Sequence, residues 1–255
     1  FYVTYHTTPD APRWKEWSRV ALQSHLDMMW HDGAPSAGAF YGIWSLDWAT
    51  ELVEAFRLNS PTDFSTHPNL KAIPAWMPTE LIPAPLTHRL VCNPRNDTDR
   101  KSMLDNNLPA MVSFSGASQF LAWAMKTYPG QSDKSGAANW LLRRGRIGEA
   151  NYWRAYSWHV PLWVTEEAPP ATLQVPQSRF HRGQGLANFR AGAWDGPMSN
   201  WALLSMNAGP WMGEHDQLDR GAFTFSALGE NWAADTGYAY IDSAQDPVDI
   251  LNFNT

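Results

Sequence analysis

The sequence has very little cysteine and no long hydrophobic run. Its 255 residues include one cysteine, Cys92, which excludes a disulfide within the chain and leaves the redox compartment open. Since the surrounding RLVCNPRN offers no base beside the thiol, we interpret Cys92 as a small buried residue rather than a nucleophile. No apolar stretch approaches the roughly 18 residues that a membrane-spanning helix needs, so a membrane span is not expected.

Positive charge is also sparse. The 19 Lys and Arg against 25 Asp and Glu give a formal net charge of −6, and the only dense basic run is at residues 143–146. Nothing in the sequence is suited to following a phosphate backbone, so nucleic acid is not an expected partner. The GxSxG, P-loop, HExxH and CxxC motifs are absent as well, which removes the common signatures of several enzyme classes.

The first ten residues, FYVTYHTTPD, contain no initiator methionine and no signal peptide. We therefore expect a processed product or a fragment of a longer protein, and these residues do not decide whether it is secreted.

Tryptophan is abundant, with 15 residues. Most are expected in the core, because an indole buries a large apolar area. Their spread through loop-like as well as helix-like stretches is also typical of a cleft in which aromatic rings stack on sugars. Some tryptophans are therefore candidate platforms for a carbohydrate.

The first two-thirds of the chain is predicted to be mainly helical. Residues 13–30 and 41–58 place apolar side chains near a 3.6-residue period, and helical patterns return at 109–127, 137–145 and 149–158. In the first of these helices the expected apolar stripe is Trp14, Trp17, Val20, Leu22, His25 and Met28. The stretch 60–99 has seven of the 19 prolines and is predicted to be a long functional loop with at most short helices.

The pattern changes near EEAPPATLQVP, residues 166–176. Beyond it, short segments with alternating apolar and polar residues are separated by Gly, Asn and Asp turns. This pattern predicts antiparallel β-structure, with a domain boundary near residues 165–170.

Residues 189–238 carry the most specific pattern. They contain FRAGAWDG, a strand ending in a Gly-Pro turn, the turn and strand MGEHDQLDRGAFTF, and the element DTGY. In order and spacing these residues resemble the start of the β-domain of the heparinase II/III-like polysaccharide lyases. Upstream, MMWHDGAPSAGAFYGIW is similar to that family's Asp-Gly helix start, with Ala37 or Gly38 where the family often has Glu.

The resemblance implies a multidomain α and β fold. Residues 1–167 would form an (α/α) toroid of helical hairpins, incomplete at its N-terminus, and residues 168–255 the start of an antiparallel β-sandwich, incomplete at its C-terminus. The active site would lie between them. The implied activity is cleavage of a uronic-acid polysaccharide, of the alginate or glycosaminoglycan type, by β-elimination. The implied partner is an acidic polysaccharide or oligosaccharide, and the implied location is periplasmic or extracellular.

The chemistry of this elimination requires particular groups. The proton at C5 of a uronate is very weakly acidic while the carboxylate is charged, so a site must neutralise the carboxylate, supply a base and protonate the leaving oxygen. By resemblance, Tyr41 is the acid/base and His215 the second proton-handling or neutralising group. A tyrosine with an ordinary pKa of about 10 needs a cationic or histidine neighbour for this role. The structural alternatives are a core aromatic for Tyr41 and a turn residue for His215.

Further candidates bind the substrate or help at the carboxylate. Arg89 and Arg190 could hold carboxylates through two hydrogen bonds, although a salt bridge within the protein is the alternative for each. Trp211 and Gln217 flank His215 and are candidate substrate-binding residues. For the family's neutralising Asn or His, the positional candidates are His25, which lies on the apolar stripe, and His31; the alternative is that this residue lies outside this chain.

Gln217 argues against a structural zinc ion. Many relatives carry a second histidine at this position, which binds zinc together with a later aspartate, here Asp235, and a further histidine. An amide is a poor zinc ligand, and no histidine follows His215. We therefore expect no cofactor, with Asp235 as the only candidate metal ligand.

Other functions stay open. A uronyl C5-epimerase would share the first proton transfer, and a non-catalytic carbohydrate-binding protein would retain the Trp-rich cleft. A glycoside hydrolase is less well supported, because its candidate carboxylates, Glu214, Asp216 and Asp219, lie on one turn and do not form an opposed pair.

Overall fold

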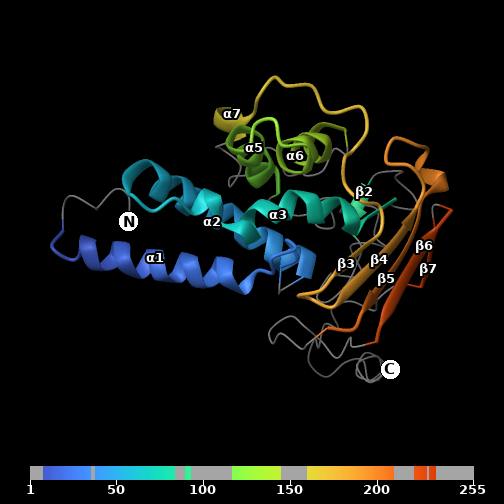
Figure 1. The fold of residues 1–255 in the computed structure, drawn as a ribbon, viewed down its shortest axis with the longest axis horizontal. Coiled ribbons are helices and arrows are strands. Elements are labelled where there is room, and N and C mark those ends of the chain that lie inside the picture. The colour runs from blue at the N-terminus through green and yellow to red at the C-terminus, as the bar shows by residue number, and fades with distance from the viewer. Residues whose placement is uncertain are drawn as a thin grey trace, which may run out of the picture.

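The computed structural model describes residues 8–35, 38–83, 90–92, 117–144, 160–209, 221–228 and 230–233. Helices dominate up to Trp163, and a five-stranded antiparallel sheet follows (Figure 1). Within these ranges, no helix is long and apolar enough to cross a membrane.

Helix α1 (Ala11–Met28) has Pro12 in its first turn, where the missing N–H of proline removes no helical hydrogen bond. Leu22 and Leu26, one turn apart, face the core, whereas Trp17 and Met28 are exposed. The predicted helix is confirmed, but most of its predicted apolar stripe is wrong. The reason is that α1 packs on its neighbours along a narrow line of aliphatic side chains, and its tryptophans lie outside that line.

Helix α2 (Gly38–Asn59) is followed by the 3-10 turn η1 (Phe64–Thr66), helix α3 (Pro68–Trp76) and the 3-10 turn η2 (Met77–Glu80). The long loop predicted over residues 60–99 allows short helices, but in its first part they occupy most of the chain rather than interrupting a loop. Pro68 and Pro78 stand in the first turns of α3 and η2, the positions where helices favour proline, and Pro74 lies inside α3.

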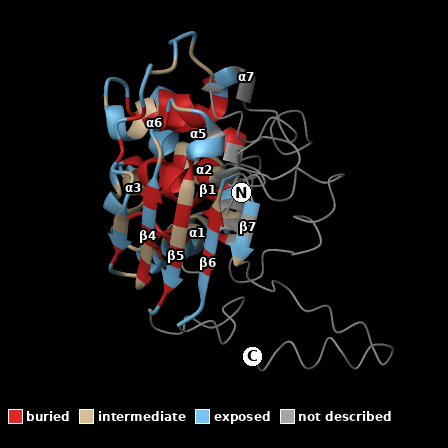
Figure 2. Cartoon of the chain, turned by 90° about the vertical axis from the view of Figure 1, so that its right-hand side faces the viewer, coloured by how far each residue is buried: buried red, intermediate tan, exposed pale blue. Residues whose placement is uncertain are grey.

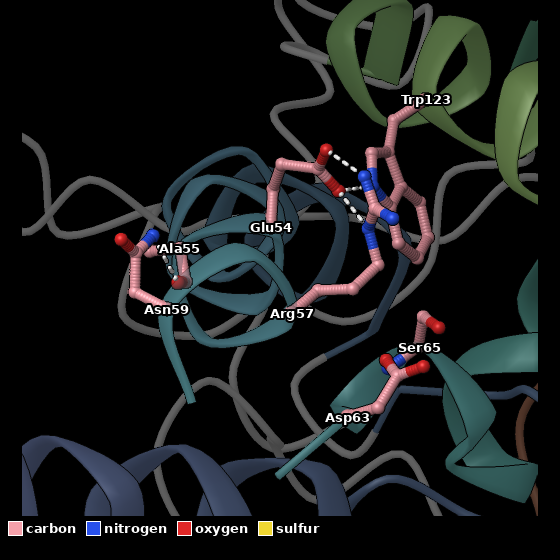
Figure 3. Close-up of polar contacts among 7 residues, drawn as sticks. All are labelled: Glu54, Ala55, Arg57, Asn59, Asp63, Ser65 and Trp123. Carbon is pink, nitrogen blue, oxygen red and sulfur yellow. Dashed lines mark hydrogen bonds and ion pairs between the residues drawn. The ribbon is translucent and has the colours of Figure 1, made fainter. Parts of the chain in front are cut away.

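The remaining helical elements are α5 (Ala117–Thr127), the π-helical turns η3 (Ser132–Gly136) and η4 (Trp140–Arg144), α6 (Ala137–Asn139) and α7 (Val160–Trp163). Helix α5 lies against α2, and Figure 3 shows one of the polar contacts between them. The indole Nε1 of Trp123 donates to Glu54 Oε2 at 3.2 Å, and Glu54 also pairs with Arg57 at 2.5 Å. The Arg57 hydrogen bond, followed by that of Trp123, holds the pKa of Glu54 below its usual value against the opposing effect of burial.

The sheet is a meander of β3 (Arg179–His181), β4 (Leu186–Ala191), β5 (Ala202–Asn207), β6 (Phe223–Ala227) and β7 (Glu230–Ala233), in that order. The predicted alternation is confirmed, since buried and more exposed residues follow one another along β4, β5 and β6 (Figure 2). The polarity of the two faces is unexpected. The face toward η2 is buried and largely polar, and the opposite face is apolar and mostly exposed. The buried polar side chains are His181, Asn188, Arg190, Ser205, Thr224 and Ser226, and the exposed apolar ones are Phe180, Phe189, Met206, Phe223 and Phe225.

A short two-stranded ladder, β1 (Leu81–Pro83) with β2 (Leu90–Cys92), completes the described strands. The mixed helical and antiparallel architecture is confirmed. Within the described residues a toroid is not confirmed, and the strands form the five-stranded sheet and the β1–β2 ladder. The boundary predicted between residues 167 and 168 falls in the segment from Val164 to Ser178, which has no helix or strand, and it stays a prediction.

Candidate active site

Tyr41 lies in the first turn of α2, which begins at Gly38. The next residue, Gly42, packs against the preceding loop so closely that a Cβ on it would lie 2.1 Å from Pro35 Cβ. Only a glycine permits this approach, so the sequence AFYG joins the start of α2 directly to residues 30–35.

The loop of residues 30–35, WHDGAP, turns back between α1 and α2. The Gly33 N–H donates to the Trp30 carbonyl at 2.9 Å, and the Ala34 N–H donates to Asp32 Oδ1 at 3.4 Å. Gly33 has a φ of +87°, and a Cβ on it would lie 2.5 Å from the Ala72 backbone in α3. The Asp-Gly pair is thus required by the turn and by its close contact with α3.

The turn of residues 182–185, between β3 and β4, is bonded to this loop. The Gly183 N–H donates to Asp32 Oδ2 at 3.3 Å, and Gln184 Nε2 donates to the Pro35 carbonyl at 3.0 Å. Asp32 and Gln184 are both largely buried, at 6% and 7% exposed. These contacts fix the start of α2 to one end of the sheet.

The described residues on either side of the segment 210–220, which contains His215, lie at the same end of the sheet. On its N-terminal side, the Ala208 N–H donates to the Gly185 carbonyl at 2.9 Å. On its C-terminal side, the Gly221 N–H donates to the Asn207 carbonyl at 2.7 Å. The residues that flank the segment on both sides are therefore held beside the 182–185 turn, and through that turn beside the first turn of α2.

Several predicted site residues lie outside the described part of the chain. They are Arg89, Trp211, His215, Gln217 and Asp235, and for Tyr41 only the position on α2 is described. Among the described residues, no group of three or more His, Cys, Asp or Glu side chains is arranged to hold a metal ion.

The two positional candidates for a neutralising histidine differ in their surroundings. His25 lies between α1 and α2, where its Nε2 is 3.3 Å from Ser45 Oγ, and burial lowers its pKa. This placement favours a packing role. His31 is exposed in the 30–35 loop, next to the Asp32 contact with the sheet.

Arg190 is buried on the inner face of β4. Its Nη2 donates to the Leu81 carbonyl and lies 3.5 Å from the carbonyls of Pro78 and Thr79. The guanidinium also lies over the rings of Trp194 and Trp201, at 4.7 and 4.9 Å from their centroids. This placement favours a structural role over the substrate contact predicted from the sequence.

A buried polar cluster joins η2 to the sheet, and sequence reasoning missed it. Asn188 Nδ2 donates to Glu80 Oε1 at 2.5 Å, and Ser205 Oγ donates to Asn188 Oδ1 at 2.5 Å. Thr79 Oγ1 lies 3.2 Å from His181 Nε2. One sequence signal could have identified the cluster: Asn188 in β4 and Ser205 in β5 are polar residues on the faces of their strands that also carry Leu186 and Leu203.

No protein-family model matches this chain, and neither does any curated protein sequence. Among solved structures it is similar to heparinase III, with a TM-score of 0.55 and 13% sequence identity over 96% of this chain. The chain spans about a third of the heparinase III chain, of which 34% is covered. The likeness establishes a distant structural relationship: a helical part and an antiparallel sheet in a similar arrangement.

Proposed function

We propose that this protein is a polysaccharide lyase that cleaves a uronic-acid-containing polysaccharide, of the alginate or glycosaminoglycan type, by β-elimination. One observation carries the proposal: the loop that packs on the start of α2, where Tyr41 lies, is bonded to the 182–185 turn, and that turn is bonded to Ala208. Ala208 precedes the segment that contains His215, and Gly221, which follows this segment, is bonded to the neighbouring Asn207. The distant likeness to heparinase III supports it. The proposal includes the finer fold, in which the helices belong to an (α/α) toroid and the sheet is one layer of a β-sandwich.

In this mechanism the Tyr41 oxygen, as phenolate, removes the proton from C5 of the uronate. The electron pair of the broken C5–H bond forms a double bond between C4 and C5 while the bond from C4 to the leaving oxygen breaks. Tyr41 then returns its proton to that oxygen. His215 lowers the pKa of the tyrosine, or neutralises the substrate carboxylate, as a cationic or hydrogen-bonding neighbour.

The other predicted roles belong to the same proposal. Arg89 would pair with a substrate carboxylate, Trp211 would stack on a sugar ring, and Gln217 would donate a hydrogen bond to the substrate. No cofactor takes part in this mechanism, and a zinc ion at Asp235 is not included because Gln217 is a poor ligand. A periplasmic or extracellular location, which the family resemblance implies, is part of the same proposal.

The test is to incubate the protein with alginate, heparin and hyaluronan and to follow the ultraviolet absorbance of the unsaturated product. We expect Tyr41→Phe and His215→Gln each to lower the rate by about a thousandfold, the effect of losing a group that transfers a proton in the transition state.

Two substitutions of the same kind serve as controls. Tyr128→Phe removes a buried hydroxyl that donates to the Ser65 carbonyl at 2.9 Å, and His67→Gln removes an imidazole that lies 3.1 Å from Asp27. Both should retain the wild-type rate. Exchange of the C5 hydrogen with heavy water, without unsaturated product, would identify a uronyl C5-epimerase instead. If none of the polymers gives unsaturated product and none shows exchange of the C5 hydrogen, the proposal is contradicted.

A further inference from the structure

An open groove of about 750 Å³ lies along the edge of the sheet, and one of its lining residues, Ala72, belongs to the part of α3 that contacts Gly33 of the 30–35 loop. One wall is α3, the second is η3, and the third is the segment of residues 174–180 that leads into and forms part of β3. None of its lining residues belongs to the loop 30–35, the start of α2 or the turn 182–185. The groove and the candidate active site therefore have different lining residues, although α3 contacts both; Figure 1 shows the elements α3 and β3 that form two of its walls.

The groove is positively charged in a protein that is negative overall. Three cationic side chains line it, Lys71, Lys134 and Arg179, and the only acidic lining residue within the described part of the chain is Asp133. Lys134 is paired with Asp133 at 3.0 Å. Among the described residues, no hydrogen bond or ion pair involves the Lys71 ammonium or the Arg179 guanidinium. Two half-buried cations thus remain available to an anionic ligand, in a chain whose formal net charge is −6.

The walls of the groove are held by contacts of their own. The Trp194 Nε1 donates to the Val175 carbonyl at 2.9 Å, and Ser178 Oγ accepts from the Arg190 N–H at 3.0 Å. On the opposite wall, Leu70 and Ile73 of α3 are fully buried in the core. Because both walls are fixed, binding in the groove would require little ordering of the protein.

We propose that this groove binds an acidic oligosaccharide, as a second site for the polymer on which the protein acts. Arg179 and Lys71 would hold carboxylate or sulfate groups, with Arg179 able to form two parallel hydrogen bonds. The alanine, proline and valine side chains of the walls would contact the C–H faces of the sugar rings. The choice of a sugar over another anionic polymer rests on the proposed function. The charge and shape of the groove are observed independently of that function.

The test compares two double variants that lose the same two charges. Lys71→Gln/Arg179→Gln removes the free cations of the groove, and Lys126→Gln/Arg143→Gln removes two exposed cations elsewhere. Both are made in a Tyr41→Phe background so that the ligand is not cleaved. Calorimetric titration uses hexasaccharides from alginate and heparin, with neutral cellohexaose for comparison. The parent should titrate with two binding sites for the acidic ligands; we expect the groove variant to lose at least about tenfold in affinity at one of them, and the control to remain within about twofold of the parent at both.

A second measurement does not depend on any substitution. Acetylation of lysines, followed by mass spectrometry, should show Lys71 protected by the acidic hexasaccharide and Lys126 unprotected. Equal affinities of the two double variants together with unprotected Lys71 would overturn the proposal. Equal or tighter binding of a poly-glutamate peptide in the groove would overturn the assignment to a sugar.

The outcome is distinguishable from that of the proposed function. If the groove variant loses binding while the wild-type protein forms no unsaturated product, the groove is supported as a binding site and the lyase activity is contradicted. If the wild-type protein forms unsaturated product while the groove variant binds as tightly as the parent, the lyase activity is supported and the groove is contradicted as a binding site.

Discussion

Arg190 places a positive charge in the protein interior, and its surroundings explain how the fold tolerates it. The Leu81 carbonyl accepts a hydrogen bond from its Nη2, and the carbonyls of Pro78 and Thr79 lie 3.5 Å from the same atom. The ring faces of Trp194 and Trp201 lie against the guanidinium. The negative faces of aromatic rings stabilise a desolvated cation. Burial lowers the pKa of Arg190 to about 9, which leaves the group protonated at neutral pH. Arg190 therefore ties η2 to β4.

We expect Arg190→Ala to lower the free energy of unfolding by about 3 kcal/mol, because it leaves carbonyls without a donor and a cavity between two indoles. Urea unfolding followed by tryptophan fluorescence would measure this change. Arg179→Ala is the matched control, since its guanidinium is half-buried and bonded to no described residue, and it should cost less than about 0.5 kcal/mol. Similar losses in the two variants would show that Arg190 does not tie the two elements together.

Close backbone contact joins the β3–β4 turn to the end of β5. A Cβ on Gly209 would lie 1.6 Å from the Gln184 carbonyl oxygen and 3.0 Å from Gly185 Cα. These atoms belong to backbone that is already hydrogen-bonded, so it cannot move aside cheaply. Gly209 is also the last described residue before the segment that contains His215.

Gly209→Ala should accordingly lower the free energy of unfolding by about 2 kcal/mol or more. Gly136→Ala provides the comparison, because the nearest atoms to its added Cβ would be 3.8 and 3.9 Å away and its backbone is helical. We expect that variant to be neutral or slightly more stable, since alanine favours the helix over glycine. Thermal unfolding followed by circular dichroism would compare the two variants. A Gly209→Ala variant as stable as the wild-type protein would contradict the close contact at this position.

The helices and strands differ in how well the sequence predicts them. The 3.6-residue period of α1 identifies a helix, but hydrophobicity cannot say that Leu22 and Leu26 face the core while Trp17 faces outward. That choice depends on which neighbours α1 has. The prolines of residues 60–99 suggest a loop, yet Pro68 begins α3, because proline both ends and starts helices. The alternation of β4 to β6 is predicted well, since it depends on neighbouring residues only.

The candidate site is predicted unevenly for similar reasons. Asp32 and Gly33 attract attention as a motif, and their contacts with the sheet and α3 explain why these residue types are present. Glu80 and His181 give no such signal, because their cluster is assembled from residues about 100 positions apart, as in the contact between Thr79 and His181. The roles of Tyr41 and His215 stay predictions.

The molecule as a whole has a sheet whose polar face is buried and whose apolar face is exposed. Phe189 on β4 and Phe223 on β6 are 54% and 56% exposed, whereas Asn188 and Ser205 behind them are fully buried. Contiguous apolar patches of this kind usually mark a surface that another layer covers. The proposed β-sandwich would supply such a layer, and the inner polar face would then belong to the junction with the helices.

Substitutions on the two faces of the sheet would show which face is free in this chain. Phe189→Thr/Phe223→Thr should change the free energy of unfolding by less than about 1 kcal/mol, because both side chains are exposed and threonine favours strands. The same variant should bind less of a fluorescent dye that adsorbs to apolar surface. Leu203→Ala, on the buried face at 2% exposure, should cost about 3 kcal/mol. A loss of several kcal/mol in the double threonine variant, with unchanged dye binding, would mean that the apolar face is already covered in solution.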